Sequence, residues 1–238
     1  MKRERINVNF GHIIPISTVD WHKKPVCMVF FNGCPFKCIW CQNYKLLDYN
    51  QHVDINIVMK KIDESMDFVS GVVFSGGEPT SQENVLDVLL RFVKRHDLLT
   101  GIQTNGYYPL VIRKLVDHNL IDKIFLDIKA PISEPKYKAI TGIDDAHKKV
   151  VESFNIVNMS QVSSEIRTTV FRPFIQDVFD IAAFLESRNY RGTYVLQTGI
   201  PNNAPEGDIR KEEPIKSAEM SALSKKVAKE TGINVKYT

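Results

Sequence analysis

Three cysteines stand close together in the sequence, at positions 34, 38 and 41, whereas the fourth cysteine of the chain, Cys27, stands apart from them. Three thiolates from one short loop can bind three irons of a cubane iron–sulfur cluster and leave the remaining iron without a protein ligand. Catalytic metal sites usually keep one such open position, because a substrate has to bind there. We therefore predict that Cys34, Cys38 and Cys41 form a catalytic metal centre.

Two other interpretations of these cysteines are compatible with the residues alone. A structural zinc site normally has a fourth cysteine or a histidine at zinc-finger spacing, and neither His22 nor His52 stands at such a spacing. A simple electron carrier would need a fourth thiolate, which only Cys27 could supply. Cys27 lies in the apolar segment VCMVFF, so we expect it to be a small buried core residue.

Short β-rich apolar runs alternate along the chain with stretches of helical period, and these elements must position the cysteines. The expected strands are residues 26–31, 71–74, 101–104, 123–129, 166–171 and 193–197, and residues 233–237 suit a final edge strand. Asp54 is a suitable N-cap for the first helix, and Thr80 with Glu83 suits a capping box for the second. Repeated βα units imply parallel strands. Because the units are too few to close a barrel, we expect an α/β fold of the partial (βα)6 barrel type, laterally open, as a single domain over residues 1–238.

Other polar residues follow the carboxyl ends of the expected strands, where parallel α/β folds carry their chemistry. In SGGEP, Gly76 and Gly77 would let the backbone approach a ligand closely, and the carboxylate of Glu78 could accept an ammonium group. By itself, however, a Gly-Gly pair is simply a turn. The remaining strand-end residues are Thr104, Asn105, Asp127, Lys129 and Arg167. Considered alone, charged residues at such places are more often solvated or paired with each other than ligands.

The cysteine loop, residues 32–43, and SGGEP together resemble the radical S-adenosylmethionine (SAM) superfamily: C-x-x-x-C-x-x-C follows the first strand, with Trp40 just before the third cysteine. The resemblance implies a 4Fe–4S cluster on Cys34, Cys38 and Cys41, with SAM bound to the open iron through its amino and carboxylate groups. It implies reductive cleavage of SAM to methionine and a 5′-deoxyadenosyl radical, which abstracts a hydrogen atom. It also implies that the GGEP segment binds the SAM amino group, that Phe36 and Trp40 shield the cluster from water, and that Trp40 lies near the adenine.

Longer phrases resemble the activating enzymes of glycyl radical proteins, in particular that of anaerobic ribonucleoside-triphosphate reductase: STVDW, GCPFKCIWCQN, FLDIKAP, YKAITG, RTTV and YVLQ. This resemblance implies that the substrate is a glycine in a flexible loop of a partner protein and that a flavodoxin- or ferredoxin-type protein donates the electron. It places Thr104, Asn105, Asp127, Lys129 and Arg167 at the SAM ribose and carboxylate. Some activating enzymes also hold a monovalent cation, using an aspartate where this sequence has Gln103, so a cation site is weakened here.

Two rival functions remain. One is a radical SAM enzyme that acts on a small molecule, similar to 7-carboxy-7-deazaguanine synthase, which also uses a short barrel. The other is a non-catalytic iron–sulfur electron carrier. No cysteine follows Cys41, so the chain can hold one cluster. The polar, proline-rich residues 201–214 suit either a lid that faces a partner protein or an ordinary surface loop.

The composition is that of an ordinary globular protein, with 43% hydrophobic and 25% charged residues among 238. A formal net charge of +3 gives no argument for a nucleic acid or a membrane surface as partner. No apolar run approaches the about 18 residues of a membrane span, and the basic start lacks the features of an export signal. The cysteines are crowded together as in a metal site, rather than spread along the chain as disulfide-forming cysteines are. We therefore expect a cytoplasmic protein.

Overall fold

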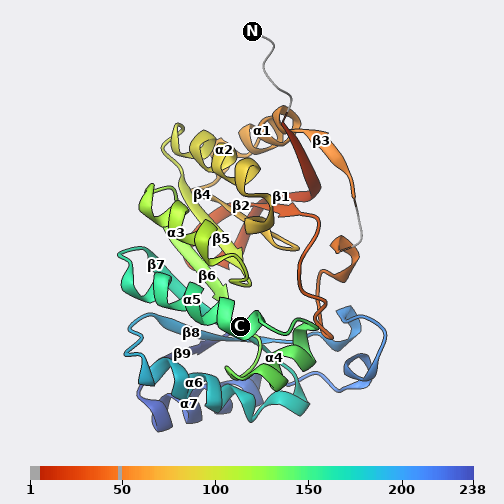
Figure 1. Ribbon diagram of the computed structural model, residues 1–238, viewed down its shortest axis with the longest axis vertical. Helices are drawn as coiled ribbons and strands as arrows, with labels where there is room; N and C mark the ends of the chain where they lie inside the picture. Colours follow the sequence, from red (N-terminus) through yellow and green to blue (C-terminus); the bar gives the residue numbers. More distant parts are fainter. Residues whose placement is uncertain (1–5, 48–49) are drawn as a thin grey trace. The chain divides into compact units, whose positions relative to one another are not determined.

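The structure is a computed structural model that describes residues 6–47 and 50–238, and their contacts divide the chain into two compact units (Figure 1). Among the described residues, the first unit comprises 6–35, 45–47, 50–104 and 110–124. The second comprises 36–44, 105–109 and 125–238. The expectation of a single domain over residues 1–238 stays a prediction.

The first unit is built on strands that stand in the order β3-β1-β2-β4-β5. Their bounds are β1 Asn7–Trp21, β2 Lys24–Phe31, β3 His52–Asp54, β4 Gly71–Gly76 and β5 Leu99–Thr104. β2 pairs with β4 and β4 with β5 in parallel, whereas β1 is antiparallel to both β2 and β3. The strands predicted at 26–31, 71–74 and 101–104 are therefore confirmed, and β1 and β3 are additions that the sequence pattern did not predict.

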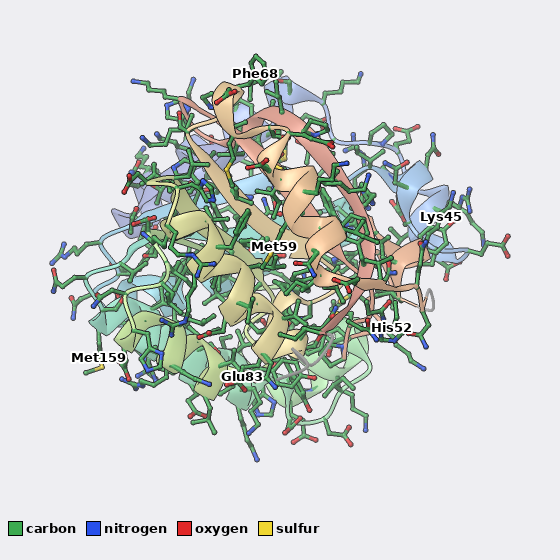
Figure 2. All side chains as sticks on the ribbon, turned by 90° about the horizontal axis from the view of Figure 1, so that it is seen from above. Lys45, His52, Met59, Phe68, Glu83 and Met159 are labelled. Atoms are coloured by element: carbon green, nitrogen blue, oxygen red, sulfur yellow. The ribbon has the colours of Figure 1, made fainter. Side chains whose placement is uncertain are left out.

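The helices of the first unit begin close to their expected positions. They are α1 Ile55–Asp63, α2 Glu83–Lys94 and α3 Pro109–Asp117, with short 3-10 turns η1 Tyr44–Leu46, η2 Met66–Phe68 and η3 Pro79–Gln82; Glu83, the first residue of α2, is labelled in Figure 2. Asp54 is the N-cap of α1, because its Oδ1 accepts a hydrogen bond from Asn56 N at 2.9 Å. The capping box of Thr80 and Glu83 is wrong, because Glu78 caps η3 and takes both the N–H and the hydroxyl of Thr80.

The second unit carries the strand order β6-β7-β8-β9. Its strands are β6 Lys123–Asp127, whose first residues belong to the first unit, β7 Ser163–Val170, β8 Thr193–Thr198 and β9 Asn234–Tyr237. Its helices are α4 Glu134–Thr141, α5 Ala146–Met159, α6 Asp177–Ser187 and α7 Ser217–Thr231, with 3-10 turns η4 Arg172–Phe174, η5 Pro201–Asn203 and η6 Asp208–Lys211. β8 is parallel to β7 and to β9. The four strands predicted in this part of the chain are confirmed.

Neither strand order closes on itself: β3 is an edge strand in the first unit and β9 in the second. The chain thus has an α/β fold with a mostly parallel, open sheet, which confirms the predicted fold class. Within residues 6–47 and 50–238 there is no helix with the length and apolar character that crossing a bilayer requires.

The apolar residues of the strands are buried as a core, and Cys27 is one of them. Its side chain is fully buried, and burial raises the pKa of its thiol to about 11. This confirms the expectation that Cys27 is a core residue. The largest exposed apolar side chains occur singly, for example Phe68 in the first unit and Met159 in the second, which both project from the surface (Figure 2), and single residues of this kind are normal.

Residues 201–214 form an ordered loop of two 3-10 turns in the second unit. Pro201, Ala204 and Ile209 point inward and are buried, while the residues between them are mostly exposed. The guanidinium of Arg172 holds the end of the loop by donating to Pro214 O at 3.2 Å and to both carboxylate oxygens of Glu219 at 3.0 Å. Whether this loop faces a partner protein stays a prediction.

Asp122 links the end of α2 to the start of β5 within the first unit. Both carboxylate oxygens lie 2.6 Å from Lys94 Nζ, and Oδ2 also accepts from Thr100 N at 2.7 Å. Burial would raise the pKa of this carboxyl, but Lys94 and the Thr100 N–H outweigh burial and lower it. A lowered pKa in the folded state means that this stabilisation is present above the unfolded-state value, about 4, and is lost as the pH falls through the folded-state value.

We expect Asp122→Asn to lower the free energy of unfolding by about 1–3 kcal/mol at pH 7, because it removes charged hydrogen bonds. The difference from the wild type should shrink as the pH falls below about 4, because Asp122 is then protonated first in the unfolded chain and, at still lower pH, in the folded protein. Urea denaturation at pH 7 and pH 3 measures both effects. Asp117→Asn is the matched control, because Asp117 is exposed at the end of α3. A difference that is the same at both pH values would contradict the assignment.

Candidate functional site

The part of the cysteine loop that carries Cys38 and Cys41 rests on the end of α4, within the second unit. Lys37 N donates to Thr141 O at 2.9 Å and Ile39 N to Ile140 O at 3.1 Å, and the loop closes with Cys41 N donating to Cys38 O at 3.1 Å. α4 ends at Gly142, which adopts the left-handed conformation that glycine tolerates best. The last carbonyls of a helix have no partner inside the helix, and here they bind the cysteine loop. This contact gives the phrase YKAITG a structural purpose.

The cysteines of the loop form no disulfide bond with one another and are largely withdrawn from water. Cys38 is 7% exposed, and Cys34 and Cys41 are half-buried. Burial raises the pKa of the Cys38 thiol to about 12 and also raises the pKa of Cys41, while the nearby ammonium of Lys129 opposes both shifts. Thiols in such surroundings carry protons until a metal displaces them. A soft, thiolate-binding group such as an iron–sulfur cluster therefore suits this donor set.

The assignment of the three cysteines as a ligand set stays a prediction. Cys34 belongs to the first unit, and Cys38 and Cys41 belong to the second. Within the described part of the chain, no three Cys, His, Asp or Glu side chains are arranged as a ready metal site.

Two aromatic residues of the cysteine loop are buried against other aromatic residues of the second unit. Trp40 is 3% exposed, and its ring centroid lies 5.5 Å from that of Phe171 and 4.7 Å from that of Phe174. Phe36 is fully buried and packs edge-on against Tyr107 at 5.4 Å. Close aromatic packing of this kind would keep water away from the loop. Contact between Trp40 and the adenine of SAM stays a prediction.

The SGGEP segment joins the carboxyl end of β2 through backbone contacts in the first unit. Gly77 N donates to Phe31 O and Glu78 N donates to Gly33 O, each at 2.8 Å. A Cβ atom on Gly77 would lie 2.0 Å from Gly33 O, and one on Gly76 would lie 2.2 Å from Phe31 O. The sequence suggested that these glycines serve the approach of a ligand. The structure shows that they are also required for the approach of one backbone to another, directly before Cys34.

Glu78 and Thr104, both predicted as site residues, meet in the first unit. The carboxylate of Glu78 is 1% exposed, and its Oε1 accepts from Thr80 N at 3.0 Å, from Thr80 Oγ1 at 2.5 Å and from Thr104 Oγ1 at 2.7 Å. A buried carboxylate with several donors is held in one orientation. The structure thus places β4 and β5 strand-end residues together as expected, and binding of the SAM amino group by Glu78 stays a prediction.

A polar chain inside the first unit adds a residue that the sequence reasoning missed. Gln103 Oε1 accepts from Ser75 Oγ at 2.7 Å, and its Nε2 donates to Asp20 Oδ1 at 3.2 Å. Asp20 Oδ2 in turn accepts from Ser17 Oγ at 2.5 Å. A carboxylate therefore lies beside the position where some activating enzymes have an aspartate. Asp20 is 83 residues away in sequence and lies on the unpredicted strand β1, so no local pattern could have revealed it.

The predicted cations of the second unit each have a carboxylate partner. Lys129 Nζ lies 3.0 Å from Asp127 Oδ2. Burial would lower the pKa of Lys129, but Asp127 together with Cys38 and Cys41 outweighs burial and raises it. Arg167 is 7% exposed; its Nε lies 2.8 Å from Glu165 Oε1, and its guanidinium lies over the ring of Phe125. Asn105 Oδ1 accepts from Tyr107 N at 3.0 Å. The paired charges agree with the plainer interpretation of strand-end residues, and contacts of these residues with SAM stay predictions.

A cavity of about 660 Å³ in the first unit lies apart from these residues. Side chains of α2 and α3 line it, among them Asp87, Arg91 and Lys114, and none of the predicted site residues does. Its charges compensate each other, because Arg91 pairs with Asp87 at 2.8 Å and Lys114 pairs with Glu83 at 2.6 Å. The predicted site residues therefore lie outside the lining of this cavity.

Comparison with known proteins settles the family. Residues 28–185, which include the three cysteines, SGGEP and the strand-end residues, match the sequence model of the Radical SAM superfamily. The chain belongs to the radical SAM superfamily. This confirms the predicted enzyme class, and the family implies a 4Fe–4S cluster and SAM as cofactors.

Relatives of this radical SAM enzyme carry names of activating enzymes. One, from Methanocaldococcus jannaschii and named for glycyl-radical enzyme activation, is 30% identical over 218 residues, which cover 90% of this chain and 89% of the relative. The pyruvate formate-lyase 1-activating enzyme of Escherichia coli is 30% identical over 127 residues, 50% of each chain. Among solved structures, Streptococcus suis SuiB bound to precursor peptide SuiA has a TM-score of 0.70 at 15% identity, covering 90% of this chain and 48% of that one. The last likeness shows the fold alone.

The pairing of Thr104 with Glu78 can be tested in the metal-free protein. We expect Thr104→Val to lower the free energy of unfolding by about 1–3 kcal/mol, because the buried carboxylate loses a donor. Thr104→Ser keeps the hydroxyl and should recover most of that loss. Urea denaturation measures the difference between the two variants. Equal stabilities would show that the hydroxyl contributes nothing to holding Glu78.

Proposed function

We propose that this chain is a glycyl radical enzyme activase, which uses SAM to abstract an α-hydrogen from one glycine of a partner such as anaerobic ribonucleoside-triphosphate reductase. The observation that carries the proposal is the similarity to a relative named for glycyl-radical enzyme activation, which extends over about nine-tenths of both chains. The half-length match to a pyruvate formate-lyase 1-activating enzyme supports the same reaction class. In this proposal the partner is a protein substrate.

In the proposed enzyme, Cys34, Cys38 and Cys41 would hold the 4Fe–4S cluster. When bound and reduced by a flavodoxin- or ferredoxin-type protein, the cluster would supply the one electron needed for cleavage of SAM to methionine and a 5′-deoxyadenosyl radical, which would abstract the hydrogen atom of the glycine. The products would be 5′-deoxyadenosine and a glycyl radical on the partner.

The chain's own residues would prepare this chemistry by binding and by excluding water. Trp40 and Phe36, which are buried against other aromatic residues, would keep water from the thiolates. The charge of Lys129, held beside Cys38 and Cys41 by Asp127, would stabilise the thiolate forms. The GGEP segment would receive the SAM amino group. Thr104, Asn105, Asp127, Lys129 and Arg167 would contact its ribose and carboxylate.

The ligand set predicts a sharp difference between the cysteines. We expect Cys34→Ala, Cys38→Ala and Cys41→Ala each to lose the intact cluster and the formation of 5′-deoxyadenosine after anaerobic reconstitution with iron and sulfide. Cys27→Ala, the same change at the buried core cysteine, should keep both. Iron analysis, electron paramagnetic resonance (EPR) spectroscopy and a 5′-deoxyadenosine assay with SAM and dithionite make the comparison. Loss of the cluster in Cys27→Ala, or its retention in any variant of the trio, would refute the assignment.

The partner is tested by radical transfer. The reconstituted, reduced protein is incubated with SAM and an anaerobic ribonucleoside-triphosphate reductase, and a glycyl radical is expected in the EPR spectrum of the reductase. A reductase whose radical-bearing glycine is replaced by alanine is the control and should give no signal. Turnover of a small pterin-like molecule without any protein partner would favour the small-molecule alternative. A bound cluster that never yields 5′-deoxyadenosine would favour an electron carrier.

A further inference from the structure

Gln82 makes an unusual set of contacts for a residue of a short turn. It is the last residue of η3, three residues after Pro79 of GGEP, and its side-chain amide binds both backbone polar groups of Asn9 in β1. Its Oε1 accepts from Asn9 N at 2.9 Å, and its Nε2 donates to Asn9 O at 3.0 Å. The same Nε2 lies 3.4 Å from Asn32 O. The side-chain amide of Gln82 thus accepts a hydrogen bond from one backbone N–H and donates to two backbone carbonyls.

Asn32, directly before Gly33 and Cys34, belongs to the same network. Its side chain is 1% exposed, and its Nδ2 donates to Phe10 O at 2.8 Å and to Asn9 Oδ1 at 3.2 Å. Its backbone N–H donates to Asn9 O at 3.0 Å. We call Asn9, Asn32 and Gln82 the amide latch. All three residues lie in the first unit.

The amide latch brings the start of the cysteine loop together with the chain that follows the loop. It holds Asn32, the first residue of the loop, and Gly33 N donates to Leu46 O at 2.9 Å. Further along the chain, Gln51 N donates to Asn9 Oδ1 at 3.0 Å. Asn32 and Gln51 therefore both contact Asn9. The position of Cys34, which follows Gly33, depends on how firmly this meeting point is held.

The amide latch also reaches the GGEP segment through the chain that carries Gln82. Glu78 N donates to Gly33 O at 2.8 Å, and Ser81 Oγ donates to Glu78 O at 2.7 Å. Gln82 follows Ser81, so its grip on Asn9 and Asn32 fixes the far end of the same turn. Gly33 and Glu78 are thus bound to each other directly and again through Gln82. A double connection of this kind restricts sliding between two backbones that must approach closely.

The chemistry of the contacts explains why a glutamine is needed. A glutamate of the same shape could accept from Asn9 N but would turn a carboxylate oxygen toward the carbonyls of Asn9 and Asn32, where a donor is needed. An alanine would leave these backbone groups to water. Glutamine can therefore make all of these contacts, whereas glutamate, its closest isostere, cannot.

We propose that Gln82 is a positioning residue that sets the backbone of Cys34 against the GGEP segment and thereby tunes the affinity for SAM. The inference rests on the part of the proposed function in which Cys34 binds the cluster and GGEP binds the SAM amino group. It requires no particular partner protein. Gln82 acts through the backbone and touches neither cofactor itself.

The first experiment uses the metal-free protein and compares Gln82→Ala and Gln82→Glu with the wild type by hydrogen exchange. We expect the amide hydrogens of Gly33 and Glu78 to exchange at least about tenfold faster in both variants, because the local opening becomes easier. Amides of β7 and β8 in the second unit should be unchanged. Gln51→Ala is the matched control, because Gln51 contributes its backbone N–H, which this substitution keeps.

The second experiment titrates SAM anaerobically into the reconstituted protein with its cluster oxidised, so that SAM is not cleaved, and measures binding by isothermal titration calorimetry. In Gln82→Ala and Gln82→Glu we expect unchanged iron content and a dissociation constant for SAM raised by about tenfold, or about 1.4 kcal/mol. Gln51→Ala should match the wild type. Leu89→Ala, which removes fully buried side-chain volume from α2, controls for general destabilisation of the same unit.

Wild-type affinity for SAM in Gln82→Ala and Gln82→Glu would overturn the proposal, and so would an equal loss of affinity in Leu89→Ala. If Gln82→Ala fails to fold, Gln82→Glu decides, since it keeps the size of the side chain and the bond to Asn9 N. Failure of both to fold would assign Gln82 a purely structural role and also overturn the proposal. Absence of radical transfer to a partner would refute the activase function but leave both readouts on Gln82 intact.

Discussion

The close backbone contact between the end of β2 and the SGGEP turn is the constraint on which the predicted site residues of the first unit depend. Gly33 and Gly77 approach so closely that even a methyl group on Gly77 would overlap Gly33 O. Two hydrogen bonds, Gly77 N to Phe31 O and Glu78 N to Gly33 O, make the contact specific in register. Because Cys34 follows Gly33, the same contact sets where the cysteine loop starts. The glycines therefore join two functional segments before any ligand is considered.

Most polar groups buried around this contact have hydrogen-bond partners, the exception among the described residues being Asn32 Oδ1. The carboxylate of Glu78 collects donors from Thr80 and Thr104, and the side chain of Asn32 donates to the backbone of β1. Unpaired buried groups would carry a desolvation penalty of about 1–3 kcal/mol each. In the second unit, Arg167 with Glu165 and Lys129 with Asp127 follow the same rule. A region with this many buried polar groups can thus remain rigid while it stays polar.

The sequence predicted the parallel strands well because their patterns are strong. β4 reads GVVFSG and is buried on both faces, as expected of a strand that helices cover. β1 was missed because Gly11 and Pro15 interrupt it, its register to β2 shifts three times, and Ile14 and Ile16 are exposed, so neither alternation nor a continuous apolar run is visible. The capping box failed because Glu78 lies nearer to Thr80 than Glu83 does and takes its hydrogen bonds. The candidate site residues were identified by their resemblance to a family. Their partners could not be predicted, because Asp20, which contacts Gln103, and Gln82, which contacts Asn9, are distant in sequence from the residues that they contact.

The contacts of Gln103 show how a distant partner residue can compensate for a difference from the family's sequence pattern. A glutamine in place of an aspartate removes a negative charge from the end of β5. The structure brings Asp20 to the amide of Gln103, which donates to it, while Ser75 donates to the amide oxygen. The carboxylate is thus supplied by β1 rather than β5, and Ser17 Oγ and Gln103 Nε2 are among the donors that hold it. The residue at position 103 is therefore best understood together with Asp20 and Ser75, as one polar group built from three strands.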